Sequence, residues 1–221
     1  SCFNFNVLFL LSAGMLTVAI VLALTINYHK PATTKPGFNL IEKAALRPTI
    51  VVFFITMTYG AVVAFIALYA AQQGIGNIGS FFTIYALTLA LARPLCGRLA
   101  DRIGFGFVII PGIILIAGAM FLLYFAGSIQ WFWLVAILYG AGFGAAQPAL
   151  QALAVISVPP QRRGLANGTF FTGFDMGIGL SSIMWGAVAG VTGYSVMYLL
   201  ATIPAIAALV SYLLLGRKAP A

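Results

Sequence analysis

The sequence predicts an all-α integral membrane protein with seven transmembrane helices. Of its 221 residues, 62% are hydrophobic and only 6% are charged, which is too few charges to cover the surface of a soluble protein. The apolar residues gather into seven runs, each long enough to cross a bilayer as a helix. The basic residues fall in or beside alternate connections between these runs, as expected of a chain that crosses a membrane repeatedly.

The first predicted span covers residues 7–26, which carry no charge and match the thickness of the hydrocarbon core. Residues 27–48 follow as a polar connection that contains prolines, a glycine and several basic side chains. We expect a short surface helix in this connection, at residues 40–46.

Three further spans are predicted at residues 49–71, 80–96 and 105–126. A short, uncharged and glycine-rich loop at residues 72–79 joins the first two of them. Residues 97–104, the charged segment, join the next two and combine charge with glycine. Between two such apolar runs, the charged segment is expected to form a tight turn at the membrane surface.

The last three spans are predicted at residues 131–158, 165–190 and 194–215. Pro148 lies inside the first of them and lacks the N–H donor that a helix needs, so we expect a bend there. A polar segment at residues 159–164 ends that span.

The orientation follows from the distribution of the basic residues. All eleven lie in or beside the odd-numbered connections or in the tail: Lys30, Lys35, Lys43, Arg47, Arg93, Arg98, Arg102, Arg162, Arg163, Arg217 and Lys218. The positive-inside rule places these connections and the C-terminus in the cytoplasm, and the N-terminus of the chain outside. The net charge of +8 is thereby explained, so we expect the lipid bilayer, and no nucleic acid, as a partner. The predicted location is a cell membrane, such as a bacterial inner membrane.

The charged segment reads Gly-Arg-Leu-Ala-Asp-Arg-Ile-Gly. Gly97 and Gly104 allow two helices to end and begin close together. Asp101 is expected to cap the next helix and to face the positive end of its dipole. Arg98 and Arg102 offer forked donors to carboxylates or to lipid phosphates.

This segment resembles the G-x-L-a-D-r-x-G signature of the major facilitator superfamily, found between the second and third helices of each six-helix half. The match covers Gly97, Leu99, Ala100, Asp101, Arg102 and Gly104. The family pattern usually continues with two basic residues, whereas Phe105 and Gly106 stand here. Residues 139–148 and 160–169 are similar to the branch of proton-driven drug and sugar exporters.

The resemblance implies two six-helix halves joined by a cytoplasmic loop. On that layout residues 1–26 match the last helix of the N-terminal half, residues 27–48 the central loop, and residues 49–221 the C-terminal half. It implies a secondary active transporter and not an enzyme, with a small amphipathic organic molecule and protons as partners and no cofactor or metal. The other helices would come from the same transporter or from a second copy. The charged segment would act as a gate, with Asp101 and an arginine latching the cytoplasmic side.

A stripe of aromatic and amide side chains on the fifth span is the predicted substrate site. Its members are Tyr139, Phe143, Gln147 and Gln151. They are four residues apart and therefore share one helix face, where rings can stack on an amphipathic substrate and amides can hydrogen-bond to it. The competing interpretation of the glutamines is hydrogen bonding between helices. Tyr59 and Tyr85, on the second and third spans, are the other predicted binding residues.

Two charged side chains lie inside predicted spans. Arg93 is about one turn from the cytoplasmic boundary, and we expect it to reach towards the headgroups. Asp175 lies eleven residues past Gly164, about 16 Å into the membrane at 1.5 Å per residue. Its helix face carries small or polar residues: Gly168, Thr172, Gly179 and Ser182. We expect Asp175 to carry the coupling proton or to bind a cationic substrate; a protonated, purely structural role is the alternative.

A seven-helix receptor-like or scaffold protein without transport is the alternative from another class. A retinal pump is excluded because no predicted span contains the lysine that its Schiff base needs. A channel is not supported, because the sequence has no filter-like loop or ring of charge. A short protein that dimerises to rebuild a cavity is a third hypothesis.

The topology can be tested with single cysteines. Cysteines that replace Lys35 and Arg163 should react with a membrane-impermeant maleimide only from the cytoplasmic side, and those that replace Asn77 and Ser128 only from outside. Labelling of positions 77 and 163 from the same side would contradict the seven-span arrangement.

Overall fold

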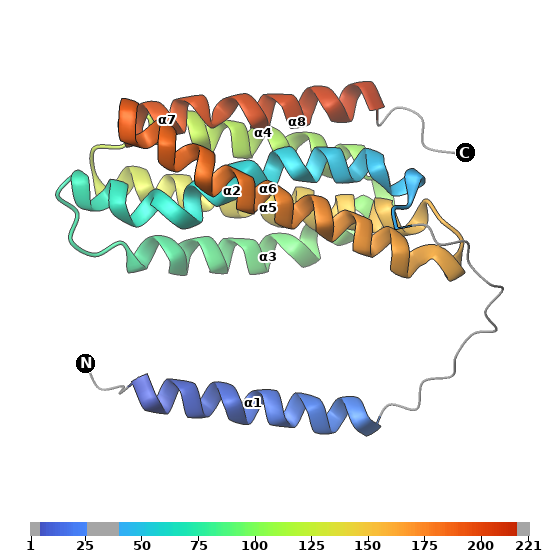
Figure 1. Ribbon diagram of the computed structural model, residues 1–221. Coiled ribbons are helices and arrows are strands. Elements are labelled where there is room, and N and C mark those ends of the chain that lie inside the picture. The colour runs from blue at the N-terminus through green and yellow to red at the C-terminus, as the bar shows by residue number, and fades with distance from the viewer. Residues whose placement is uncertain (1–4, 26–39, 216–221) are drawn as a thin grey trace. The chain divides into compact units, whose positions relative to one another are not determined.

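The computed structural model describes residues 5–25 and 40–215. The chain divides into two units, Ser1–Gly37 and Phe38–Ala221. The first unit contains one uncharged helix, α1 (Phe5–Thr25), drawn in blue in Figure 1. Its 21 residues extend over about 31 Å at 1.5 Å per residue, which is enough to cross a hydrocarbon core.

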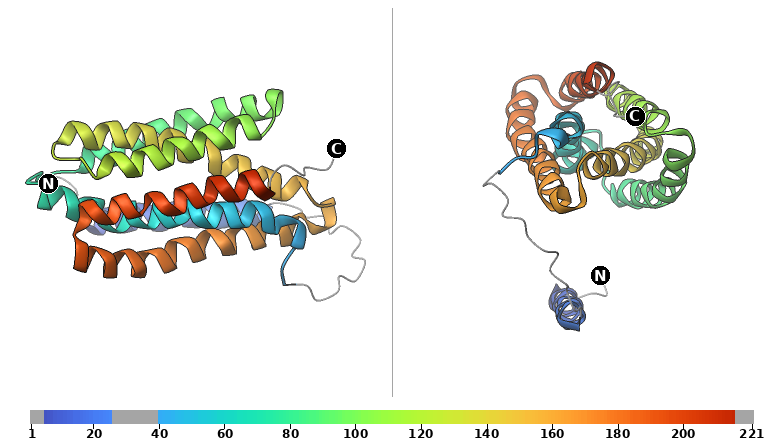
Figure 2. Two further views of the ribbon diagram at one scale, coloured as in Figure 1. Left: turned by 90° about the horizontal axis from the view of Figure 1, so that it is seen from above. Right: turned by 90° about the vertical axis from the view of Figure 1, so that its right-hand side faces the viewer.

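The second unit is a set of long helices that run side by side (Figures 1 and 2). They are α2 (Leu46–Gln72), α3 (Gly79–Ile103), α4 (Gly106–Leu123), α5 (Ile129–Ile156), α6 (Arg163–Thr192), α7 (Tyr194–Leu200) and α8 (Thr202–Leu215). Six spans in this unit are long and apolar enough to cross a membrane, with α7 and α8 together forming the last. With α1 as a further apolar helix and no strand in the described ranges, the predicted all-α membrane fold is confirmed.

Helices α2 and α5 form the buried centre of the second unit. Helix α2 packs mainly on α6 and α8, and α5 packs mainly on α3 and α4; the end-on view of Figure 2 shows this arrangement. Roughly half of the α2 and α5 spans is buried, whereas only a small part of the α3 and α6 spans is buried. The second unit therefore leaves long faces of α3 and α6 uncovered.

Glycines allow α2 and α6 to approach backbone to backbone. A Cβ added at Gly177 would meet the Thr56 hydroxyl and lie 2.5 Å from the carbonyl oxygen of Phe53. One added at Gly60 would lie 3.0 Å from the carbonyl oxygen of Ile178. Lipid tails are as apolar as leucine, so the hydrophobic effect does not drive helices together within a bilayer. Close packing of small residues is therefore a main source of helix association there.

The prediction of a turn throughout residues 97–104 is wrong. Helix α3 continues to Ile103 and ends at Gly104, whose φ of +100° lies in the region that glycine adopts without strain. Asp101 therefore belongs to the last turn of α3 and does not cap α4, since the N-cap of α4 is Phe105, without a side-chain cap hydrogen bond. The 25 residues of α3 extend over about 38 Å, so its charged end can emerge from a core of about 30 Å while remaining helical.

The connection before α2 also differs from the prediction. Instead of a surface helix at residues 40–46, a single 3-10 turn forms at Lys43–Ala45, and α2 begins directly after it at Leu46. Glu42 caps the turn by accepting a backbone N–H bond. The first part of the predicted central loop, residues 27–39, lies outside the described residues.

The close contact between α2 and α6 predicts opposite effects for two glycine substitutions on α6. Gly177→Ala should lower the stability of the protein by about 1–3 kcal/mol, because the new methyl group meets α2 and the helices must separate. Gly190→Ala should leave stability unchanged or raise it slightly, because nothing lies within 4 Å of the new Cβ and alanine favours the helix. Thermal unfolding in detergent, followed by tryptophan fluorescence, measures both; equal melting temperatures would contradict the packing.

Candidate substrate cavity

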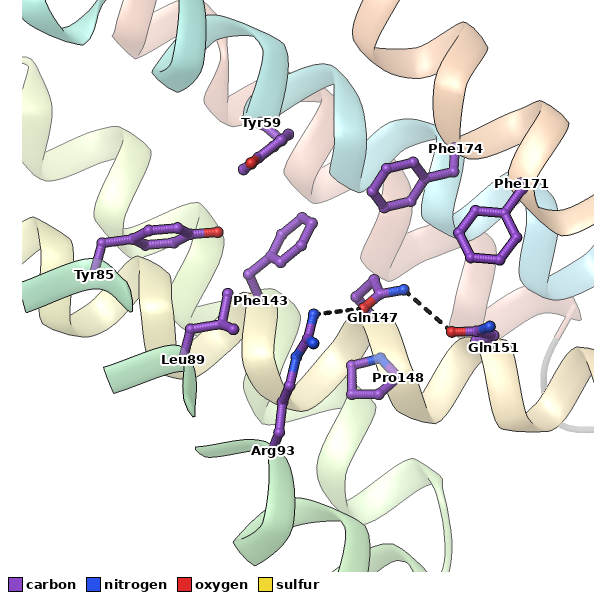
Figure 3. Close-up of a pocket in the computed structure, with 10 residues that line it drawn as sticks. All are labelled: Tyr59, Tyr85, Leu89, Arg93, Phe143, Gln147, Pro148, Gln151, Phe171 and Phe174. Carbon is purple, nitrogen blue, oxygen red and sulfur yellow. Dashed lines mark hydrogen bonds between the residues drawn. The ribbon is translucent and has the colours of Figure 1, made fainter. Parts of the chain in front are cut away.

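A cavity of about 430 Å³ opens between four helices of the second unit, which is within the size range of small-molecule sites. Its wall is formed by side chains from α2, α3, α5 and α6, shown in Figure 3. They are Tyr59, Tyr85, Leu89, Arg93, Phe143, Gln147, Pro148, Gln151, Phe171 and Phe174. The cavity therefore brings together five of the six residues predicted to bind substrate.

Aromatic rings make up one side of the cavity. Tyr59 of α2 stacks on Phe143 of α5, with ring centroids 5.0 Å apart. Phe174 of α6 meets Phe143 edge-on at 6.4 Å and Phe171 at 5.9 Å. The rings thus offer both faces and edges to a flat apolar molecule.

Tyr139, the sixth predicted residue, lies behind this wall. It is fully buried, and its hydroxyl forms a hydrogen bond of 2.9 Å with the Thr58 hydroxyl. Its ring stacks on Phe143 at 6.0 Å and lies 6.0 Å from that of Tyr85. In this conformation Tyr139 supports two rings of the cavity and is not itself among the lining residues.

A chain of polar side chains runs along the other side of the cavity (Figure 3). Arg93 Nη2 donates to Gln147 Oε1 at 3.4 Å, and Gln147 Nε2 donates to Gln151 Oε1 at 3.5 Å. Gln151 Nε2 donates in turn to Asn167 Oδ1 at 3.0 Å. We refer to Gln147, Gln151 and Asn167 as the amide chain. Gln147 and Gln151 each accept from one neighbour and donate to the next, and Asn167 accepts at the end, so each of the three amide oxygens receives its hydrogen bond from the side of Arg93.

The helical repeat and two glycines place these groups. Tyr85, Leu89 and Arg93 are four residues apart on α3 and share one face. Cβ atoms added at Gly140 and Gly144 of α5 would lie 2.9 and 3.0 Å from carbonyl oxygens of α3. These glycines therefore let α3 lie directly against α5, which brings its polar face to the amide chain.

Sequence reasoning missed half of the cavity wall: Leu89, Arg93, Pro148, Phe171 and Phe174. Arg93 was expected to reach for the headgroups, but it bonds to Gln147 instead. Its spacing from Tyr85, together with its position inside an apolar span, was the available signal, because charged residues within membrane helices usually face a functional interior.

Asp175 lies outside the group of lining residues. It follows Phe171 by one helical turn on α6, but its side chain is exposed. Gly168, Thr172 and Gly179, predicted to share its face, are exposed as well. In residues 40–215 no basic side chain forms an ion pair with Asp175.

The charged segment forms the C-terminal end of α3. Arg98, Asp101 and Arg102 are exposed, and within the described part of the chain no ion pair joins them. A small pocket of about 110 Å³ lies beside Gly97 and Asp101, against α5.

An ion pair forms elsewhere, between Glu42 and Arg162 at 3.3 Å. Glu42 is buried, and its backbone N–H donates to the Thr169 hydroxyl at 3.0 Å. These contacts fix the residues before α2 to the start of α6. The described residues contain no cluster of three or more His, Cys, Asp or Glu that could hold a metal ion.

Proteins of known sequence resemble this chain over most of its length. It is 32% identical over 174 residues to the multidrug resistance protein MdtG of Dickeya zeae, covering 75% of this chain and 42% of that protein. It is 27% identical to the staphylopine export protein of Staphylococcus aureus, covering 72% of this chain and 41% of that protein. An uncharacterized MFS-type transporter of Methanocaldococcus jannaschii is 28% identical, with 73% and 42% covered. The chain thus spans about two fifths of these relatives.

Solved structures show the same fold. A variant of the peptide transporter POT in complex with alafosfalin superposes with a TM-score of 0.70 at 19% identity, over 83% of this chain and 40% of that one. A POT family transporter in complex with a thioalcohol-conjugated peptide gives a TM-score of 0.69 at 20% identity. Residues 75–221 match the Major Facilitator Superfamily as a family. With its helices, its charged segment and this match over more than half its length, the chain belongs to the major facilitator superfamily.

Proposed function

We propose that this chain forms the C-terminal part of a secondary active transporter that exports a small amphipathic organic molecule by alternating access. The observation that carries the proposal is the cavity, which combines an aromatic wall with an amide chain between four helices. The names of two relatives, a multidrug resistance protein and a staphylopine export protein, support the direction of transport.

The uncovered faces of α3 and α6 are where the rest of the transporter would close the cavity. On this proposal residues 1–26 are the last helix of the N-terminal half, and the opposite wall comes from that half or from a second copy. The N-terminus of the chain lies outside and its C-terminus in the cytoplasm of a cell such as a bacterium. Rocking of the two halves against each other then exposes the cavity to one side at a time.

Binding in the cavity would use both of its sides. Phe143, Phe171 and Phe174 offer ring surface to the apolar part of the substrate. Gln147 and Gln151 each retain amide hydrogen-bonding capacity beyond the bonds of the amide chain. Tyr59 and Tyr85 add hydroxyls, and Tyr139 holds the wall in place from behind.

Asp175 is the proposed proton-coupling residue. An ionised carboxylate inside a membrane span is costly, so such a residue normally faces protein or water and serves a function. Asp175 has no basic partner in residues 40–215, and its exposed face lies on a helix that the remaining half would cover. Protonation when the site faces one side, and release at the other, would couple substrate movement to the proton gradient.

Substitution of Asp175 tests the coupling. In the complete transporter, reconstituted into proteoliposomes, Asp175→Asn should reduce proton-driven accumulation of substrate to the level of protein-free vesicles, because the amide cannot exchange a proton. Downhill exchange should persist, since the cavity is unchanged, and Asp175→Glu should restore part of the accumulation. Normal accumulation by Asp175→Asn would show that the coupling acid lies elsewhere.

Asp101 tests the proposed gate. If an ion pair of Asp101 with Arg98 or Arg102 latches the cytoplasmic side in the outward-open state, Asp101→Ala should shift the population towards inward-open states. Cysteine accessibility on both sides of the membrane measures this shift. Unchanged accessibility would mean that Asp101 is a polar end of α3 without a gating role.

A further inference from the structure

The wall of the cavity carries a single charge. Of its ten lining residues, Arg93 alone is charged, and it comes from α3 with its guanidinium directed towards Gln147 (Figure 3). Arginine stays protonated in proteins, so this charge is permanent. A permanent charge inside a membrane span calls for a partner that neutralises it.

The described residues, 5–25 and 40–215, do not supply that partner. The chain contains three acidic residues in all, and each of them is described by the structure. Glu42 is paired with Arg162, Asp101 lies on the exposed last turn of α3, and Asp175 is not among the lining residues. No carboxylate oxygen of the three lies within 4.0 Å of a guanidinium nitrogen of Arg93.

The amide chain leaves most of the guanidinium available. Arg93 has five N–H donors, and its hydrogen bond to Gln147 uses one of them, at a long 3.4 Å. Gln147 is nearly buried, and its amide is held between Arg93 and Gln151. The oxygen of Gln147 therefore orients the guanidinium but does not neutralise its charge. The guanidinium lies between the polar and the aromatic sides of the cavity.

We propose that the substrate of this cavity is an organic anion: a carboxylate attached to an aromatic or other flat apolar body. The carboxylate binds Arg93 through two parallel N–H···O bonds, the geometry that a guanidinium offers and an ammonium does not. The apolar body lies against Phe143, Phe171 and Phe174, on the aromatic side of the cavity. This inference rests on the proposed transport function and adds the chemical class of the substrate.

Three probes of nearly equal size isolate the charge: methoxycoumarin acetate, its primary amide, and the corresponding amine. Their binding to the complete transporter is measured by fluorescence anisotropy in detergent. The unmodified protein should bind the acetate about 10- to 100-fold more tightly than the amide, the range for hydrogen bonds to a charged group, and should bind the amine no better than the amide.

Variants assign that preference to Arg93. Arg93→Gln should bring the affinity for the acetate down to that for the amide and leave the amide unchanged, whereas Arg93→Lys should keep part of the preference because the charge remains. Arg163→Gln is the matched control: it removes an exposed positive charge at the start of α6, outside the cavity, and should keep the full preference.

Other results would overturn the inference. Equal binding of the three probes would mean that an acid from outside residues 40–215 neutralises Arg93. A preference that survives Arg93→Gln would place the anion site elsewhere. If Arg93 instead holds the phosphate of an anionic lipid, Arg93→Gln would reduce co-purified phosphatidylglycerol and leave the order of the probes unchanged.

Transport assays keep this result separate from the proposed function. If vesicles accumulate the amide or the amine as readily as the acetate, the transport proposal stands and the proposal of an anionic substrate is wrong. Probes that bind with the expected preference but are not transported would reject the transport proposal and retain the anion site.

Discussion

The structure of the second unit depends on close backbone contact between helices. Glycines mediate this contact at the two most extensive helix pairs. Gly60 and Gly177 lie between α2 and α6, and Gly140 and Gly144 lie between α5 and α3. In lipid, burial of apolar side chains does little to hold helices together, so packing distance takes over that role. The same contacts set the width of the cavity, because they determine how far the side chains of α3 and α6 reach across the faces of α5 and α2.

Buried polar groups are satisfied within the bundle, as they must be where water is absent. The Tyr139 hydroxyl bonds to Thr58, the Tyr69 hydroxyl donates to the carbonyl oxygens of Leu123 and Ala126, and the described residues leave no buried side-chain N or O atom without a partner. These bonds hold the scaffold in one arrangement. Arg93 is different, because the side chain that it bonds to is neutral and no acidic group in the described ranges forms an ion pair with it.

The sequence was sufficient for the spans and for much of the cavity, because both follow from periodicity. Spacing by four residues placed Gln147 and Gln151 on one face, and the structure has them side by side. The sequence was not sufficient where the exposure of a side chain to the cavity depends on a neighbouring helix. Tyr139 shares that face but is covered by α2 and α3, which no pattern within α5 reveals. The end of α3 was misplaced for another reason: charge marks where a chain leaves the membrane, whereas the left-handed conformation of Gly104 marks where the helix ends.

Arg93 and Asp175 are the two charges within the membrane spans that bear on the proposed exchange, and they form no ion pair with each other. In the proposed exchange, each charge would therefore be neutralised separately, Asp175 by a proton and Arg93 by an anion. The membrane potential then acts on both. An organic anion that leaves the cytoplasm moves along an inside-negative potential, and so does a proton that enters. Exchange of one for the other transfers two charges in the favourable direction, worth roughly 4.6 kcal/mol per 100 mV. An anionic substrate therefore fits export better than a cationic one, whose exchange for one proton would draw nothing from the potential.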